Sequence, residues 1–130
     1  MMATGKHILL VDDDIVLSEM YSERLKAAGY SVTVMHDGEA GLAEAKNKPD
    51  LILLDIMMPK MNGLDVLKRL KADPTLAKIP VILLTALIQE LDKVKGIKSG
   101  AVDYYVKSEV MPGDLIKRIE KVLAEHAKDE

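Results

Sequence analysis

Polar side chains of a few reactive types directly follow four of the short apolar runs in this sequence. In chain order they are Asp12, Asp13, Asp14, Asp55, Thr85 and Lys107. Several carboxylates within a few ångströms of one another cannot all ionise comfortably without a cation. Oxygen ligands alone suit a hard ion that keeps part of its water shell, namely Mg²⁺. A hydroxyl and an ammonium beside such an ion are the groups needed to hold the remaining oxygens of a phosphoryl group.

Each of these residues also has a simpler structural explanation. An aspartate after a buried strand is often the N-cap of the next helix, and capping is the preferred explanation for Asp12 or Asp14 taken alone. A single lysine after a strand is usually solvated, and a single threonine there is usually a cap or a strand residue. The argument for a common site is that four of five runs bring such groups to one place.

The apolar runs have the length and composition of buried strands. They cover residues 7–11, 31–35, 51–54, 81–84 and 102–106, and four of them are nearly continuous in β-branched residues or Leu. Such runs are typical of strands that are covered on both faces. Helical spacing after each run predicts five helices, with Asp37 and Asn62 as N-caps of the second and third and Gly29 ending the first. The fourth helix is predicted over residues 89–99.

Alternation of strand and helix five times predicts a parallel sheet with helices on both faces. Two doubly wound strand orders fit this α/β alternation, and five strands fit the flavodoxin-like order 2-1-3-4-5 best. In this order the first and third strands are neighbours at the point where the winding reverses. Ligands bind there, beyond the carboxyl ends of the strands, which is where the acidic residues are expected to meet.

Composition restricts the class of protein. The chain has 130 residues, 48% apolar and 30% charged, which is typical of one globular domain. The absence of Cys excludes disulfides and thiolate metal sites. A net charge of −3 is too balanced for a nucleic-acid binder that works by counterion release. No membrane span, signal peptide or glycine-rich phosphate loop is found. We therefore expect one soluble, cytoplasmic domain over residues 1–130, with a core at about 6–127 and no output domain.

Four segments carry motifs in a fixed order: ILLVDDD at 8–14, LLDIMMPKMNG at 53–63, VILLTA at 81–86 and GAVDYYVK at 100–107. Together they resemble the receiver domain of two-component response regulators, of the single-domain chemotaxis type. The likeness covers nearly the whole chain, and four motifs in the right order and spacing make it specific. It implies a phosphorylation-dependent signalling switch and not an enzyme, because the only reactions implied are phosphoryl uptake and hydrolysis by the domain itself.

The resemblance implies roles for the acidic residues and their neighbours. Asp55 corresponds to the aspartate that attacks the phosphohistidine of a sensor kinase and becomes an acyl phosphate. Asp13 corresponds to a direct Mg²⁺ ligand and Asp12 to the second acid. Met57 occupies the position that supplies a backbone carbonyl to the ion.

Three further residues correspond to those that hold the phosphoryl group and transmit its presence. Thr85 and Lys107 match the hydroxyl and the amine that bind phosphoryl oxygens, and Tyr104 matches the aromatic switch residue. Movement of Thr85 toward the phosphoryl group would free space beneath the fourth helix, into which the Tyr104 ring could rotate. The implied partners are a histidine kinase or phosphotransfer protein and an unidentified protein effector, without direct contact to nucleic acid or membrane. The domain is expected to be a monomer or a phosphorylation-dependent dimer.

The sequence departs from the family pattern at a few positions. Ser108 stands where the family has a proline preceded by a cis peptide bond, and without proline a cis bond costs roughly 2.5–4 kcal/mol. Glu109 replaces a position that is commonly aromatic. The second residues after Asp55 and Thr85 are apolar, Met57 and Leu87, and neither can orient a hydrolytic water. We therefore predict a long-lived phosphoryl state.

Two other functions remain compatible with parts of the sequence. A scaffold module that keeps the fold without being phosphorylated is consistent with Ser108, although the complete acid set, Thr85 and Lys107 argue against it. A metal-dependent phosphohydrolase that passes through an aspartyl phosphate needs a second acid two residues after the nucleophile. Met57 is at that position, so the phosphohydrolase is the least favoured of the three functions.

Overall fold

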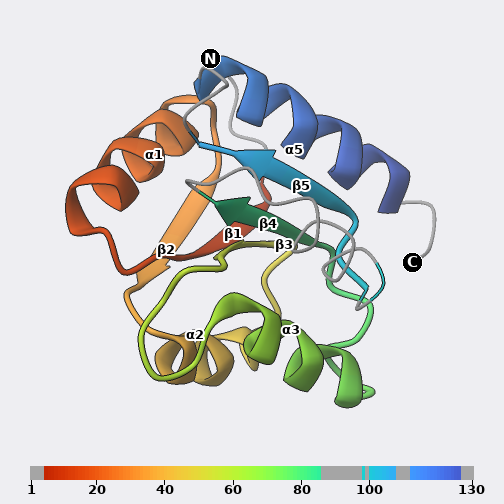
Figure 1. Ribbon diagram of the computed structural model, residues 1–130. Helices are drawn as coiled ribbons and strands as arrows, with labels where there is room; N and C mark the ends of the chain where they lie inside the picture. The colour runs from red at the N-terminus through yellow and green to blue at the C-terminus, as the bar shows by residue number, and fades with distance from the viewer. Residues whose placement is uncertain (1–4, 86–97, 99, 108–111, 127–130) are drawn as a thin grey trace.

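The computed structural model of the chain describes residues 5–85, 98, 100–107 and 112–126. The strands are β1 (His7–Val11), β2 (Ser31–Met35), β3 (Leu51–Asp55), β4 (Val81–Thr85) and β5 (Asp103–Val106). The helices are α1 (Ile15–Ala27), α2 (Gly38–Ala45), α3 (Gly63–Ala72) and α5 (Pro112–His126). Within the described residues a helix follows each strand except β4, after which the next described element is β5 (Figure 1). Of the helix predicted over residues 89–99 only Lys98 is described, in a helical conformation, and the rest lies outside the described residues.

The five strands are parallel and lie in the order β2-β1-β3-β4-β5, as the sequence predicted. Val11 lies opposite Leu54, and Asp55 lies opposite Leu84. β3 and β4 extend one residue further than predicted, so Asp55 and Thr85 belong to the strands themselves. Their backbones are therefore fixed by the hydrogen-bonded ladder, and the carboxyl ends of the central strands meet at one edge.

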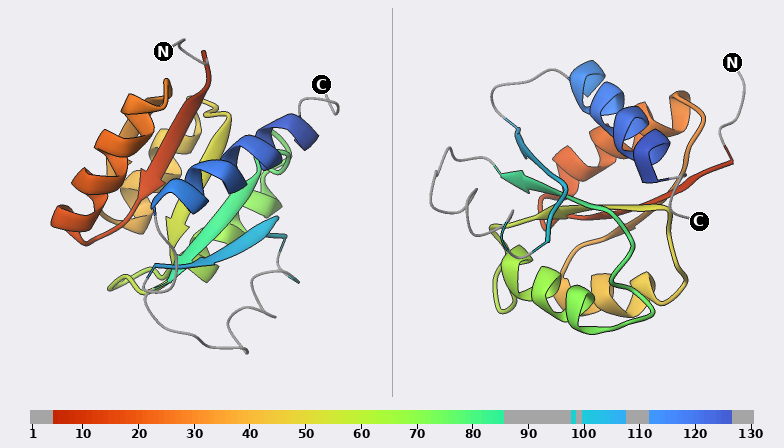
Figure 2. Two further views of the ribbon diagram at one scale, coloured as in Figure 1. Left: turned by 90° about the horizontal axis from the view of Figure 1, so that it is seen from above. Right: turned by 90° about the vertical axis from the view of Figure 1, so that its right-hand side faces the viewer.

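Helices cover both faces of this sheet. Figures 1 and 2 show α1 and α5 on one face and α2 and α3 on the other. Alternate strand residues supply the two cores: Ile8 and Leu10 pack with the α1 and α5 side, whereas Leu9 and Val11 pack with the α2 and α3 side. Burial on both faces explains why the central strands are continuously apolar.

Polar side chains begin the helices at the positions that the sequence indicated. The side chains of Asp14, Asp37 and Asn62 accept hydrogen bonds from backbone N–H groups three residues ahead, at 2.9, 2.7 and 3.0 Å. Gly29, after α1, has a φ of +102°, a conformation that favours glycine. Among the described helices, none combines the length and the apolarity that crossing a membrane requires.

Candidate functional site

The three aspartates at the carboxyl ends of β1 and β3 form one acidic cluster. Asp12, Asp13 and Asp55 each place a carboxylate oxygen within 4.8 Å of the others. Asp12 and Asp55 are buried, with 0% and 4% of their surface exposed, and Asp13 is exposed. Asp12 is not a helix cap, contrary to the simplest explanation for it alone, because Asp14 caps α1. Asp12 Oδ1 instead accepts the backbone N–H of Asp14 at 2.9 Å.

Lys107, which follows β5, places its ammonium group in this cluster. Lys107 Nζ lies 2.6 Å from Asp12 Oδ2 and 3.6 Å from Asp55 Oδ1. Its backbone N–H donates to the carbonyl of Thr85 at 2.7 Å, which fixes where the side chain starts. Thr85 itself is buried at the end of β4, opposite Val106. The lysine is therefore paired mainly with Asp12, and a small shift would bring it to a group attached to Asp55.

Burial and neighbouring charges alter the protonation of the cluster. Loss of water around its carboxylate raises the pKa of Asp55 to about 7, with Lys107 opposing this shift and Asp12 adding to it. Burial alone would lower the pKa of Lys107, but the hydrogen bond to Asp12 and the charge of Asp55 outweigh burial and raise it. In the ion-free site the Asp55 carboxyl is thus partly protonated near neutral pH.

The donor set fits a hard divalent cation. Three carboxylates, two of them buried, gather around one ammonium group, and one positive charge cannot balance three negative ones. All the side-chain donors are oxygens, which suits Mg²⁺ better than a softer metal. A bound divalent ion would favour the ionised form of Asp55, because it restores the charge balance that burial removed.

A tight loop after β3 positions Asp55 relative to α3. The backbone N–H of Met57 lies 3.4 Å from Asp55 Oδ1, and the N–H of Gly63 donates to the carbonyl of Ile56 at 2.9 Å. Gly63 lies so close to β3 that a Cβ atom there would overlap the carbonyl oxygen of Asp55. The Met57 side chain points away from the core and is 55% exposed.

Tyr104 lies apart from the acidic cluster. Its side chain is buried, 8% exposed, in the core on the α2 and α3 side of the sheet. Tyr105 points to the opposite face, where it packs in the core on the α1 and α5 side. The structure thus places Tyr104 in an inward position.

Two residues lie near the cluster that the sequence analysis did not assign to the site, His36 and Tyr21. His36 Nδ1 lies 3.0 Å from the carbonyl oxygen of Asp12, and its signal was its place directly after β2, the neighbour of β1. Tyr21, a buried residue of α1, lies close enough for the charges of Lys107 and Asp12 to act on its hydroxyl. Burial is the main reason that its pKa is raised. Nothing in the helical spacing separated Tyr21 from an ordinary core residue.

Comparison with known protein families identifies the origin of this arrangement. Residues 8–120 match the family model for the response regulator receiver domain. The chain belongs to this family. Its members are signalling modules of two-component systems, so phosphorylation-dependent signalling is the general function of such a domain. The five-stranded parallel order found here is the receiver fold.

Relatives and solved structures agree with this assignment. The receiver domain is 47% identical over 116 residues to the transcriptional regulatory protein CpxR of Klebsiella pneumoniae, covering 89% of this chain and 48% of that protein. It is 45% identical over 118 residues to the DNA-binding dual master transcriptional regulator RpaA of Synechocystis, covering 90% and 47%. The chain therefore spans about half the length of these relatives.

Among crystal structures, a CheY-like response regulator receiver domain protein from Methanospirillum hungatei superposes with a TM-score of 0.88 at 30% identity. That comparison covers 96% of this chain and 98% of the other. Chemotaxis protein CheY4 of Vibrio cholerae gives a TM-score of 0.82 at 33% identity, covering 94% and 99%. The departures from the family pattern at Ser108, Glu109 and Leu87 lie outside the described residues.

Proposed function

We propose that this receiver domain accepts a phosphoryl group onto Asp55 while Asp12, Asp13, Asp55 and the Met57 carbonyl hold Mg²⁺. The observation that supports this most directly is the convergence of three carboxylate oxygens within 4.8 Å beside the Lys107 ammonium. Phosphoryl transfer needs positioning and charge neutralisation more than covalent assistance, and these groups supply both.

The proposed reaction uses the Asp55 carboxylate as the nucleophile. One of its oxygens attacks the phosphorus of a phosphohistidine, the histidine N–P bond breaks, and an aspartyl O–P bond forms as the imidazole leaves. Lys107 moves from Asp12 to a phosphoryl oxygen, and the Thr85 hydroxyl binds another. When bound, Mg²⁺ would neutralise charge on the transferring group.

The donor in this proposal is a sensor histidine kinase or a phosphotransfer protein, and the output is contact with another protein. Phosphorylation of Asp55 adds a dianionic group with new acceptor oxygens at the end of β3, beside the end of β4. Thr85 would follow one of them, and the inward Tyr104 ring would change position within its core. Shifting a mostly inactive population to a mostly active one takes about 5.5 kcal/mol of differential interaction.

Intact-mass measurement with acetyl phosphate and Mg²⁺ tests this proposal. We expect the addition of one phosphoryl group per chain, absent without Mg²⁺ and absent in Asp55→Asn. Asp65→Asn, a substitution of an exposed aspartate in α3, is the matched control and should still be phosphorylated. No adduct on the wild-type chain would favour a scaffold module, and turnover of many donor molecules per chain would favour a phosphohydrolase.

A further inference from the structure

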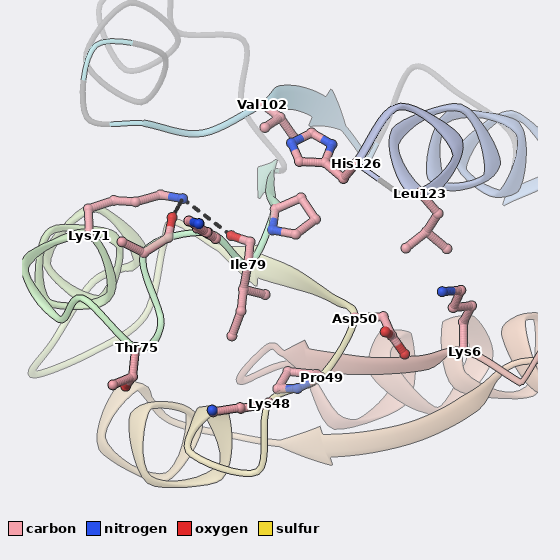
Figure 3. Close-up of a pocket in the computed structure, with 13 residues that line it drawn as sticks. Lys6, Lys48, Pro49, Asp50, Lys71, Thr75, Ile79, Val102, Leu123 and His126 are labelled. Carbon is pink, nitrogen blue, oxygen red and sulfur yellow. Dashed lines mark hydrogen bonds between the residues drawn. The ribbon is translucent and has the colours of Figure 1, made fainter. Parts of the chain in front are cut away.

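A cavity of about 650 Å³ lies at the edge of the sheet opposite the acidic cluster. Four of its lining residues directly precede strands: Lys6 before β1, Asp50 before β3, Pro80 before β4 and Val102 before β5. Parallel strands bring their amino ends to one edge, so these residues meet there. Figure 3 shows the α3–β4 connection on one side of the cavity and the end of α5 on the other.

The charge of this cavity is opposite in sign to that of the chain. Among the described residues, its lining includes four lysines and one aspartate, an excess of three positive charges with His126 neutral, whereas the whole chain carries −3. The lysines are Lys6, Lys48, Lys71 and Lys78. The one aspartate, Asp50, is already engaged, because its Oδ2 accepts the backbone N–H of His7 at 2.7 Å. Such a concentration of positive charge attracts anions.

One of these lysines is held in place. Lys71 Nζ donates to the carbonyl oxygens of Ala77 at 2.8 Å and Ile79 at 3.2 Å (Figure 3). An ammonium has three N–H groups, so the hydrogen bonds found within the described residues leave one for a ligand. The aliphatic stem of Lys71 packs against Gly100, where a Cβ would lie 3.0 Å from Lys71 Cε. Burial lowers the pKa of Lys71, because the ammonium group has lost part of its water shell. A neighbouring anion would stabilise the charged ammonium in place of that water.

Apart from Thr75 and His126, the rest of the described lining is apolar. Pro49, Ile79, Pro80, Val102 and Leu123 come from four separate segments of the chain. Val102 is 38% exposed although its side chain is large and apolar. The volume falls within the range of roughly 300–1,000 Å³ that is usual for pockets that bind small molecules, and such pockets combine an apolar lining with a few polar groups.

We propose that this cavity binds a small organic anion, with its charged group among the lysines and its apolar body against the proline, valine and leucine side chains. The site is separate from Asp55, so binding requires neither Mg²⁺ nor phosphorylation. A ligand there would bridge the start of β5, the end of α5 and the α3–β4 connection.

The test uses 8-anilinonaphthalene-1-sulfonate, which carries one sulfonate on an aromatic body and fluoresces in apolar surroundings. We expect saturable binding of one molecule per folded chain, equal in wild type and Asp55→Asn. The neutral analogue N-phenyl-1-naphthylamine and inorganic phosphate should each bind more weakly. Amide chemical shifts in a ¹⁵N spectrum should change around Asp50, Ile79 and Val102 and not around Asp12.

Paired variants separate the two parts of the site. Lys48→Gln with Lys78→Gln should weaken binding about three- to tenfold, the effect of two partly screened charges. The control pair Lys26→Gln and Lys68→Gln makes the same change in net charge on exposed helix positions outside the cavity and should leave binding unchanged. Val102→Trp should fill the apolar part and abolish binding while the protein stays folded by circular dichroism.

Several results would overturn the proposal. They are an absence of saturable binding, shift changes centred on α1 or the acidic cluster, or equal weakening by both lysine pairs. If phosphate binds as well as the sulfonate probe and Val102→Trp has no effect, the site does not recognise an apolar body. If Lys48→Gln with Lys78→Gln lowers thermal stability but not affinity, the lysines serve the nearby helix ends instead.

Discussion

At the scale of single residues, the site combines a buried aspartate, the proposed phosphoacceptor Asp55, with a lysine that is paired mainly with Asp12. Asp55 is 4% exposed, and Lys107 lies 1 Å nearer to Asp12 than to Asp55, at 2.6 against 3.6 Å. Without a bound cation the Asp55 carboxylate is therefore poorly stabilised, because it is buried and Lys107 pairs mainly with Asp12. This state has consequences for stability that can be measured without any partner protein.

The raised pKa of Asp55 predicts how the free energy of unfolding depends on pH when no metal ion is bound. Between about pH 4 and pH 7 the folded chain holds a proton on Asp55 that the unfolded chain has released, so this residue lowers stability as pH rises through that window. Asp55→Asn should remove this contribution and raise the free energy of unfolding at pH 8 by about 1–2 kcal/mol, less than the full shift because Lys107 loses a partner. Urea unfolding at pH 5 and pH 8 in EDTA measures it.

Glu23→Gln is the matched control, because it removes one negative charge from an exposed position of α1. It should leave the pH dependence as in the wild type. Addition of Mg²⁺ should stabilise the wild-type chain most at high pH, where Asp55 is ionised. Equal pH slopes in wild type and Asp55→Asn would show that burial of Asp55 does not set the pH dependence.

The apolar side chain of Met57 is the basis for predicting a long lifetime of the phosphoryl group. Its side chain is 55% exposed two residues after Asp55 and has no group that could orient an attacking water. Met57→Asn should shorten the lifetime about three- to tenfold, as expected for roughly one hydrogen bond in the transition state. Loss of the phosphoryl mass after removal of acetyl phosphate measures the rate. Met57→Leu keeps the position apolar and should decay like the wild type, so faster loss in both variants would contradict this explanation.

At the scale of elements, close contact between α3 and β3 holds the loop that follows Asp55. A Cβ at Gly63 would overlap the Asp55 carbonyl and lie 2.8 Å from Ile56 Cα, both backbone atoms that cannot rotate away. Gly63→Ala should therefore push α3 from the sheet, lower the free energy of unfolding by about 1–3 kcal/mol and slow phosphoryl uptake. Urea unfolding and the initial rate of acetyl phosphate uptake measure both effects.

Gly113 provides the matched control in α5. No atom of the described residues lies within 4 Å of a Cβ built there, so Gly113→Ala should be neutral or stabilise the chain by about 0.5–1 kcal/mol. If Gly63→Ala were as stable and as active as Gly113→Ala, the contact between α3 and the end of β3 would not position Asp55.

The strand ends explain how far the sequence could predict this site. A strand with both faces buried is read from its composition alone, and in a parallel sheet the residue after each strand has a fixed edge. For this reason the sequence could predict that Asp12, Asp55 and Lys107 belong to the site. It could not predict Tyr21, because a core-facing tyrosine on a helix gives the same periodic signal whether its hydroxyl meets a charge or not. The pairing of Lys107 with Asp12 also depends on distances of a few ångströms that no spacing rule supplies.

At the scale of the whole molecule, the two faces of the sheet hold β5 differently. On the α1 and α5 face, Arg118 bonds Asp103 Oδ1 and the carbonyl of Tyr104, both at 3.1 Å, and lies 5.5 Å from the Tyr105 ring centre. On the other face Tyr104 is buried in the α2 and α3 core. If phosphorylation acts through β5, its effect should therefore be larger at Tyr104 than at Tyr105.

The four tyrosines allow this asymmetry to be measured in one experiment. Incorporation of 3-fluorotyrosine gives four ¹⁹F signals, three from the α1 and α5 face and one, Tyr104, from the other. With Mg²⁺ and beryllofluoride as a phosphoryl mimic, the Tyr104 signal should shift as its ring is repacked. The Tyr21 signal should shift because Lys107 changes partners, while those of Tyr30 and Tyr105 stay in place.

Thr85→Ala distinguishes transmission from binding. Without the hydroxyl, β4 has no group to follow the phosphoryl oxygen, so the Tyr104 shift should be lost. The Tyr21 shift should remain, because Lys107 still responds to the bound mimic. A Tyr104 signal that stays fixed in the wild type while Tyr21 responds would contradict a switch at Tyr104 without contradicting phosphorylation at Asp55. A Tyr104 shift that persists in Thr85→Ala would show that the change reaches β5 through Lys107, the residue that follows this strand.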